Sequence, residues 1–186
     1  MDHAYDVPVS AAAIATSVAF ARVFAEHAPS VIRMLRNLGV PEPDLPDACQ
    51  ETFVVVYRKL SLFRGQSSLR TWICGISMRI AAGRRKPFRR RQETSVADLP
   101  AVASAQDLER EIDLRHAREV LAQILLGLDK PKRRVFVLHE IGQVPMADVA
   151  KVLGCPLRTA YARLKTARRE VIAAWRRATS TSPRER

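Results

Sequence analysis

The chain has 186 residues, of which 47% are hydrophobic, and a formal net charge of +12 at pH 7. This hydrophobic content is ordinary for a folded protein and excludes a wholly disordered chain. The excess of positive charge predicts a polyanionic partner, with nucleic acid ahead of an anionic membrane. No stretch approaches the roughly 20 apolar residues that cross a membrane, and the alanine-rich start lacks the basic lead of a secretory signal. We therefore expect a cytoplasmic protein without membrane insertion.

The cysteines and histidines do not suggest a site. Cys49, Cys74 and Cys155 lie far apart without a C-x-x-C pair, and the four histidines are equally scattered. An odd number of separated cysteines is typical of neither a disulfide framework nor a zinc site. The sequence therefore predicts no metal and no cofactor.

The first part of the chain is predicted to be helical. An alanine-rich helix over residues 10–28 is expected to break at Pro29, and a second helix to cover residues 30–38, where Gly39 stops it. After a proline-rich bend, Asp47 begins a helix with a clear core stripe. The stripe consists of Cys49, Phe53, Val56, Tyr57 and Leu60.

A different face of this helix has two interpretations. Asp47, Gln50, Glu51 and Val54 lie together on it. Acidic residues at a helix start complement the helix dipole, and this structural explanation is favoured by the spacing alone. The alternative is a polar docking face for a partner protein.

A loop, a helix and a basic segment follow. Residues 62–68 are predicted to form the loop, and Ser67 or Ser68 to cap the helix. The inward residues of this helix are Trp72, Ile73, Ile76 and Ile80. The helix leads into residues 84–91, where basic side chains surround Phe88. Arginines beside an aromatic ring suit single-stranded bases and phosphates, whereas an isolated charge run is also typical of a solvated tail.

Residues 92–111 are rich in small and acidic residues and lack a strong period, which predicts a flexible linker. Beyond the linker, apolar residues at helical spacing predict a helix over residues 117–128. Another helix is expected over residues 131–141, with Gly142 as its stop.

Residues 146–169 predict two helices joined by a tight turn. Gly154 suits the end of the first helix and Pro156 the start of the second. The small Ala150 and Ala160 would let the helices cross closely. The apolar stripes consist of Met146, Val149, Ala150 and Leu153, and of Leu157, Ala160, Leu164, Ala167 and Val171.

The outer face of the second of these helices is basic, with no acidic residue before Glu170. A short helix, a glycine turn and a basic helix form the pattern of a DNA-binding helix-turn-helix. A helical hairpin of a bundle with arginines on its solvated side would show the same stripe. The one-sided charge favours DNA binding, since solvated faces usually mix both signs.

These patterns together predict an all-α fold without strands or internal repeats. It consists of two small helical domains, residues 10–91 and residues 112–176, joined by the flexible linker at residues 92–111. The second domain is the helix-turn-helix, and residues 177–186 are predicted to be a disordered tail.

The segments Asp47-Ala-Cys-Gln-Glu-Thr-Phe53 and Phe63-Arg-Gly-Gln-Ser-Ser-Leu-Arg-Thr-Trp-Ile73 resemble the second domain of bacterial RNA polymerase sigma factors. Residues 131–169 are similar to the fourth sigma domain, which reads the minus-thirty-five promoter element. Because the second-domain segments come first and the fourth-domain segment follows, the chain resembles the extracytoplasmic-function (ECF) class of the sigma-70 family. The resemblance implies a factor that binds core RNA polymerase, recognises promoter DNA and promotes strand opening for transcription initiation. It also implies an anti-sigma factor as a partner.

The resemblance further implies roles for single residues. It assigns Asp47, Gln50 and Glu51 to polymerase binding, which reverses the preference for the structural explanation of that face. The loop at residues 64–68 would receive a flipped promoter base, and the next helix would support strand opening. The residues implied to contact DNA are Arg64, Gln66, Ser67, Ser68, Arg70, Trp72, Arg79, Arg84, Arg85, Arg158, Thr159, Tyr161, Ala162, Lys165 and Arg168.

Several positions depart from the usual pattern of the family. Arg79 stands where Asn is usual, and Gly83 where Asp is frequent. Arg158 and Ala160 stand where Gly and Val are common. These departures concern the promoter sequence that is read and not the architecture.

Two other functions are compatible with parts of the sequence. A stand-alone helix-turn-helix regulator would explain the second domain but leaves the faces at residues 47–53 and 63–72 without a role. A nuclease or recombinase needs convergent carboxylates or a nucleophile with a base. Asp44, Asp47 and Glu51 are the acidic cluster of the first domain, and no histidine lies near them in the sequence. We therefore predict no catalytic residues and no enzymatic activity.

Overall fold

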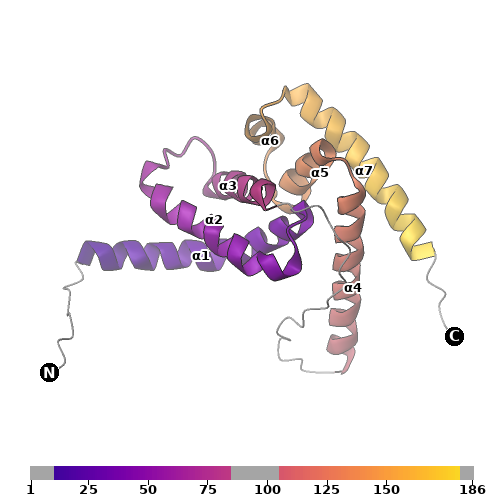
Figure 1. Ribbon diagram of the computed structural model, residues 1–186, viewed down its shortest axis with the longest axis horizontal. Coiled ribbons are helices and arrows are strands. Elements are labelled where there is room, and N and C mark those ends of the chain that lie inside the picture. The colour runs from indigo at the N-terminus through magenta and orange to yellow at the C-terminus, as the bar shows by residue number, and fades with distance from the viewer. Residues whose placement is uncertain (1–10, 85–104, 181–186) are drawn as a thin grey trace.

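The computed structural model describes residues 11–84 and 105–180, and within these two ranges the chain is helical without a strand, as predicted (Figure 1). The first range, here called the first unit, contains three long helices and two short 3-10 turns. They are α1 (Ala11–Leu38), η1 (Glu42–Asp44), α2 (Leu45–Lys59), η2 (Leu60–Leu62) and α3 (Leu69–Gly83). The second range, the second unit, contains α4 (Ala105–Gly127), α5 (Lys130–Phe136), the π-helical turn η3 (Val137–Ile141), α6 (Met146–Leu153) and α7 (Leu157–Ser180).

α1 continues through Pro29 as a single helix, so the predicted break at this residue is wrong. A proline inside a helix removes one backbone hydrogen bond and crowds the preceding turn. The helix continues because the turns around the proline bury apolar side chains, among them Ala28, Val31 and Leu35. It ends before Gly39 as predicted, where the backbone takes a φ of 93°.

α1, α2 and α3 pack around a shared apolar centre. Phe53 and Val56 of α2 and Ile73 of α3 are almost fully buried, as their spacing predicted. Tyr57 was predicted to lie in the same stripe, but its side chain is 54% exposed. Its ring meets that of Phe20 edge-on, with 5.0 Å between the centroids. Fewer faces of α2 are therefore buried near its C-terminal end, where the ring of Tyr57 lies at the surface.

The second unit contains the predicted helix-turn-helix. Gly154 ends α6 with a φ of 61°, and its N–H donates to the carbonyl of Lys151. Ala150 and Ala160 are buried where α6 packs against α7, which confirms that small residues lie at this crossing. Leu157, at the first position of α7, is 44% exposed instead of lying in the predicted core stripe.

Polar contacts fix α7 against the start of α5. Asp129 caps α5 by accepting a hydrogen bond from the N–H of Lys132 at 2.9 Å, and this bond lowers the pKa of the Asp129 carboxyl. The ammonium of Lys132 then donates to Glu170 of α7 at 2.7 Å. The buried Arg133 donates to the carbonyl of Leu128, just beyond the end of α4. Lys132 therefore connects α7 to α5, and Arg133 connects α5 to the end of α4.

The two units lie against each other. α1 contacts both η3 and α4, and the buried apolar residues of both units form one continuous core. Figure 1 shows α3 of the first unit beside α5 and α6 of the second. The fold therefore brings the two predicted domains into direct contact.

The ends of the helices shift two of the predicted boundaries. α4 begins at Ala105, so residues 105–111 of the predicted linker are helical, and α7 extends to Ser180, into the predicted tail. Residues 85–104 and 181–186 lie outside the described residues. Within the described ranges, none of the helices combines the length and apolar character needed to span a membrane.

Candidate nucleic-acid interface

Asp47, Gln50 and Glu51 project from one exposed side of α2. Their spacing of three and four residues brings them onto one helix face, and burial of the opposite face fixes the rotation of the helix. Val54 and Tyr57 continue the same exposed side and are 40% and 54% exposed. The face thus has a polar start and an apolar end. Val54 was predicted to lie on it, whereas Tyr57 was not.

One predicted polymerase-binding residue contacts one predicted DNA-binding residue. The carboxylate of Glu51 accepts hydrogen bonds from Nε and Nη2 of Arg84, at 2.9 and 2.7 Å. Arg84 directly follows α3, so the pair connects the end of α3 with the exposed side of α2. Both side chains are partly exposed, and pairs of this kind add about 0–1 kcal/mol to stability. Arg85, also predicted to contact DNA, lies outside the described residues.

The loop between α2 and α3 is held by a pair of aromatic rings. The ring centroids of Phe63 and Trp72 lie 5.2 Å apart with 39° between the ring planes. Gly65 takes a φ of 67°, which turns the chain at the tip of the loop. Arg64 and Gln66 beside it are exposed, whereas Trp72 is partly buried. The structure therefore presents Arg64 and Gln66 at the surface, with Trp72 supporting the base of the loop.

Ser68 is the residue that caps α3. Its Oγ accepts a hydrogen bond from the N–H of Thr71 at 3.1 Å and donates to Oγ1 of Thr71 at 2.9 Å. Ser67 donates instead to the carbonyl of Ser68 at 3.3 Å. The sequence predicted that either Ser67 or Ser68 caps the helix, and the structure shows that Ser68 does.

Ser68→Ala is expected to lower the free energy of unfolding by about 1 kcal/mol, since the N–H at the start of α3 loses its acceptor. Urea unfolding followed by circular dichroism measures this change. Ser67→Ala is the matched control, because Ser67 does not cap the helix. An equal loss in both variants would contradict the assignment of the cap.

The two arginines within α3 that were predicted to contact DNA do not lie on one surface of the helix. Arg70 and Arg79 are nine residues apart, which at about 100° per residue places them on opposite sides of the helix. Arg79 is exposed, whereas Nη1 of Arg70 donates to Oε1 of Gln143 in the second unit at 2.6 Å. Arg79 is therefore exposed to solvent, whereas Arg70 is bound to the second unit and Arg84 is paired with Glu51.

The predicted DNA-contacting residues of α7 lie on its outer side, since Ala160, Leu164 and Ala167 are buried on the other. Arg158, Tyr161, Ala162, Lys165 and Arg168 are exposed, and Thr159 is partly exposed. Nε of Arg168 donates to the carboxylate of Glu140 at 2.7 Å, which ties α7 to η3. Among the described residues, no carboxylate forms an ion pair with Arg158 or Lys165.

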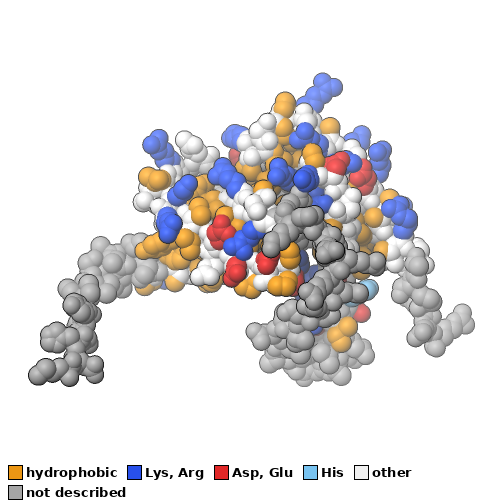
Figure 2. Space-filling model, viewed as in Figure 1, with side chains coloured by type: hydrophobic (Ala, Val, Ile, Leu, Met, Phe, Trp, Pro, Cys, Tyr) orange, Lys and Arg blue, Asp and Glu red, His pale blue; other side chains and the backbone are white. Residues whose placement is uncertain are grey.

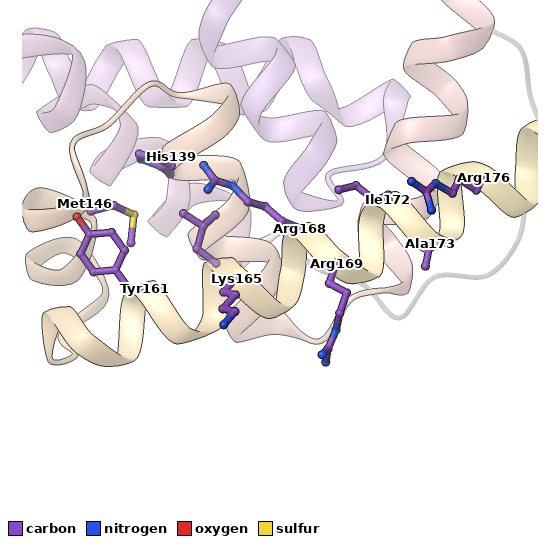
Figure 3. Close-up of a pocket in the computed structure, with 10 residues that line it drawn as sticks. His139, Met146, Tyr161, Lys165, Arg168, Arg169, Ile172, Ala173 and Arg176 are labelled. Carbon is purple, nitrogen blue, oxygen red and sulfur yellow. The ribbon is translucent and has the colours of Figure 1, made fainter.

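A groove of about 710 Å³ follows the same side of α7 (Figure 3). Figure 3 shows Arg168 and Arg176 projecting from one side of α7 and Lys165 and Arg169 from the other, with Met146 on the neighbouring segment. Ile172 also lines the groove and is 52% exposed. Ile172 and Arg176 were not predicted as site residues, although they follow Arg168 at i+4 and i+8 and so continue the outer face of the helix.

Basic side chains are spread widely over the surface. Figure 2 shows many more Lys and Arg than Asp and Glu side chains on the visible face, and the acidic ones lie in small groups beside basic ones. The positive electrostatic potential of such a surface attracts the phosphates of nucleic acid whatever their base sequence. Sequence-specific recognition must therefore depend on a few well-oriented side chains.

The two units match two models of one protein family. The model of sigma-70 region 2 matches residues 23–93, and the model of sigma-70 region 4 matches residues 118–171. The chain belongs to the sigma-70 family. It is an RNA polymerase sigma factor, a transcription regulator that binds core RNA polymerase and promoter DNA, as the motifs predicted.

Curated relatives specify the class of this sigma factor. The ECF RNA polymerase sigma-E factor of Escherichia coli (strain K12) is 26% identical over 141 residues, which cover 71% of this chain and 74% of the relative. The RNA polymerase sigma factor NccH of Alcaligenes xylosoxydans xylosoxydans is 24% identical over 163 residues, or 83% of this chain and 86% of the relative. With both regions present, the sigma factor is of the ECF class.

Solved structures of similar shape include two proteins that were each solved in complex with another protein. CnrH, solved in complex with the cytosolic domain of CnrY, has a TM-score of 0.63 and 25% identity, covering 92% of this chain and 96% of CnrH. The sigma factor RpoE, solved with the anti-sigma factor NepR from Bartonella quintana, has a TM-score of 0.58 and 19% identity, covering 84% and 96%. The second similarity concerns the fold alone.

Proposed function

We propose that this sigma factor docks on core RNA polymerase through the exposed side of α2 and reads promoter DNA with the α2–α3 loop, α3 and α7. The observation that supports the proposal is that α2 and α7 each bury an apolar side and expose a side of distinct chemistry, acidic and amide on α2 and basic on α7. The protein would contribute no catalytic chemistry. Binding energy alone would drive initiation, in the cytoplasm where the polymerase works.

The α2 face has the composition of a protein-binding surface. Asp47, Gln50 and Glu51 would form polar contacts, while Val54 and Tyr57 would pack against the partner. Interfaces of this kind combine an aromatic or aliphatic anchor with a polar surround. An exposed tyrosine beside an exposed valine suits an apolar strip on the surface of the polymerase.

The α2–α3 loop would receive an unstacked promoter base. A flipped base needs a rigid pocket with polar groups along its edge. The Phe63–Trp72 ring pair supplies rigidity, and Arg64, Gln66 and the serines beside them supply polar contacts. Arg79 and Arg84 would hold the backbone of the displaced strand.

α7 would enter the major groove of the minus-thirty-five element. Arginine and lysine hold guanine edges or phosphates there, which gives Arg158 and Lys165 their roles. Thr159, Tyr161 and Ala162 would contact base edges and thymine methyl groups. Arg168, already paired with Glu140, suits a positioning contact with a phosphate.

Two domains would act together. We propose residues 10–91 and 112–176 as the domains, with the connection at residues 92–111, whose last part belongs to α4, and the end of the chain at residues 177–186 outside both. Tethering raises the effective concentration of the second domain once the first is bound. Both promoter elements could thus be engaged by one bound molecule.

An anti-sigma factor is a further proposed partner. CnrH and RpoE were each solved with another protein bound, CnrY in one case and NepR in the other. A protein that covers the α2 face or the α7 face of this chain would block the contacts proposed above. Regulation by such a partner accords with the exposed apolar side chains on both faces.

A transcription assay with a pool of templates tests the proposal. The pool carries randomised sequence upstream of a constant reporter segment, and bacterial core RNA polymerase is supplied with or without the protein. We expect transcripts that depend on the protein and share two separated upstream elements. Duplex DNA binding without protein-dependent transcripts would instead support a stand-alone helix-turn-helix regulator.

A further inference from the structure

Glu140 of η3 holds one edge of an exposed arginine on α7. Its Oε1 accepts a hydrogen bond from Nε of Arg168 at 2.7 Å, and Nη2 of the same guanidinium lies 2.6 Å from it. Nε and Nη2 form one edge of the planar guanidinium, so the edge formed by Nη1 and Nη2 remains for a second acceptor. Figure 3 shows the Arg168 side chain reaching from α7 toward the segment that carries His139, the neighbour of Glu140. The Arg168 side chain is still 52% exposed, so the pairing does not cover it.

The backbone that carries Glu140 has little freedom. The N–H of Gly142 donates to the carbonyl of Val137 at 2.8 Å, which closes the π-helical turn around Glu140. Val137 is fully buried, and Nδ1 of His139 lies 2.9 Å from the carbonyl oxygen of Val144. Such π-helical turns are rare and occur frequently at functional sites. The turn therefore fixes the point from which Glu140 reaches α7.

Arg168 differs in this respect from two other exposed cations of α7. Among the described residues, no carboxylate forms an ion pair with Arg158 or Lys165, so each of these side chains must be ordered when it binds DNA. Ordering a long side chain at an interface weakens binding, and Arg168 is already ordered in the free protein. Phosphate contacts fix the register and orientation of a protein on a duplex. An arginine that is held in place is therefore suited to orient α7 on DNA.

We propose that Glu140 is a positioning residue for promoter recognition, an inference that rests on the proposed role of α7. It holds the guanidinium of Arg168 so that the remaining edge meets a phosphate of the minus-thirty-five element. A phosphate accepts two parallel hydrogen bonds from such an edge. Glu140 itself would not touch DNA and would act only through Arg168.

The charge of Glu140 makes the sign of its effect informative. A carboxylate beside a DNA-binding surface repels phosphates, so its removal tightens binding if it has no other role. We expect the reverse for Glu140→Ala, which should bind promoter duplex about three to ten times more weakly because Arg168 must then be ordered on binding. Glu140→Gln keeps an oxygen that accepts from Nε of Arg168, and should bind within about twofold of the wild type.

Fluorescence anisotropy of a short labelled duplex measures these affinities, and the duplex carries the upstream element recovered from the template pool. Glu170→Ala is the matched control, because it also removes an ion-paired carboxylate from the second unit, but the partner is Lys132 and not a predicted DNA contact. We expect this control to bind at least as tightly as the wild type, with thermal unfolding midpoints that are similar in all variants. Equal weakening by Glu140→Ala and Glu170→Ala would overturn the positioning role.

The effect of Glu140 must also depend on Arg168. Arg168→Ala should lower the slope of log affinity against log salt by about 0.9, which is the contribution of one phosphate contact. Adding Glu140→Ala to Arg168→Ala should cause no further loss of affinity. A loss of the same size with and without Arg168 would overturn the proposal, and so would an unchanged salt slope or tighter binding by Glu140→Ala.

The NMR signal of the Arg168 Nε–H reports the pair without DNA. We expect this proton to exchange with water about five to ten times more slowly in the wild type than in Glu140→Ala. Equal exchange in the two proteins would show that Glu140 does not hold Arg168. If no form binds the duplex, the proposed role of α7 and the positioning role both fail. If the duplex is bound and Glu140→Ala changes nothing, the positioning role alone fails.

Discussion

Alanine at both Asp47 and Gln50 is expected to weaken binding of the sigma factor to core RNA polymerase by about tenfold to a hundredfold. Both side chains are exposed on the polar part of the α2 face, and truncation of a central interface residue commonly costs more than about 1 kcal/mol. The fold should persist, since neither side chain belongs to the core. Anisotropy of a labelled protein titrated with core polymerase measures the affinity.

The control for this double variant replaces an aspartate and a glutamine elsewhere. Asp113 and Gln123 are exposed on α4, and alanine at both removes the same chemical groups. We expect this protein to bind polymerase like the wild type, with a similar thermal unfolding midpoint. Equal weakening by the two double variants would show that the α2 face is not the docking surface.

Alanine at both Arg158 and Lys165 is expected to lower the affinity for promoter duplex by about tenfold or more while leaving polymerase binding unchanged. A good contact from arginine or lysine to a base edge contributes about 1–3 kcal/mol of discrimination. Both side chains are exposed on the outer side of α7 and free of ion pairs to described carboxylates. Filter binding at several salt concentrations measures the loss of affinity for the duplex. It also shows whether phosphate contacts or base contacts were lost.

The salt dependence separates phosphate contacts from base contacts. Each phosphate contact contributes about 0.9 to the slope of log affinity against log salt, so the loss of two such contacts lowers the slope by about 1.8. An unchanged slope with relaxed sequence preference would assign both residues to base edges. Arg22→Ala with Arg33→Ala is the control, because these exposed arginines of α1 carry the same charge. Equal losses in both proteins would mean that net charge and not the α7 face determines binding.

Helices with a strict apolar period were predictable from the sequence. Apart from Tyr57 and Leu157, the buried stripes of α2 and α7 lie where the spacing placed them, and Gly39 and Gly154 end helices as expected because their backbones are left-handed. The predictions for Pro29 and Tyr57 were wrong for a common reason. A local rule ends a helix at proline and buries an aromatic residue at core spacing, but packing against neighbouring helices decided both cases.

Contacts between distant residues were not predictable in the same way. The hydrogen bond from Arg70 to Gln143 joins residues 73 positions apart, and no periodic pattern encodes such a pairing. The Glu51–Arg84 pair likewise depends on how α2 and α3 pack. Only some of the residues that line the groove beside α7 were predicted from the sequence. Ile172 lies on the outer face by its spacing, but it was not predicted because it is not basic like the predicted arginines and lysine.

Binding to core RNA polymerase tests the central claim most directly. The purified protein is mixed with bacterial core polymerase and passed over a sizing column, alone and with the Asp47→Ala, Gln50→Ala double variant. The account predicts that the wild type elutes with the polymerase and that the variant elutes mostly free. A wild type that elutes apart from polymerase but still binds duplex DNA would contradict it, and would make the first unit a scaffold for a stand-alone regulator.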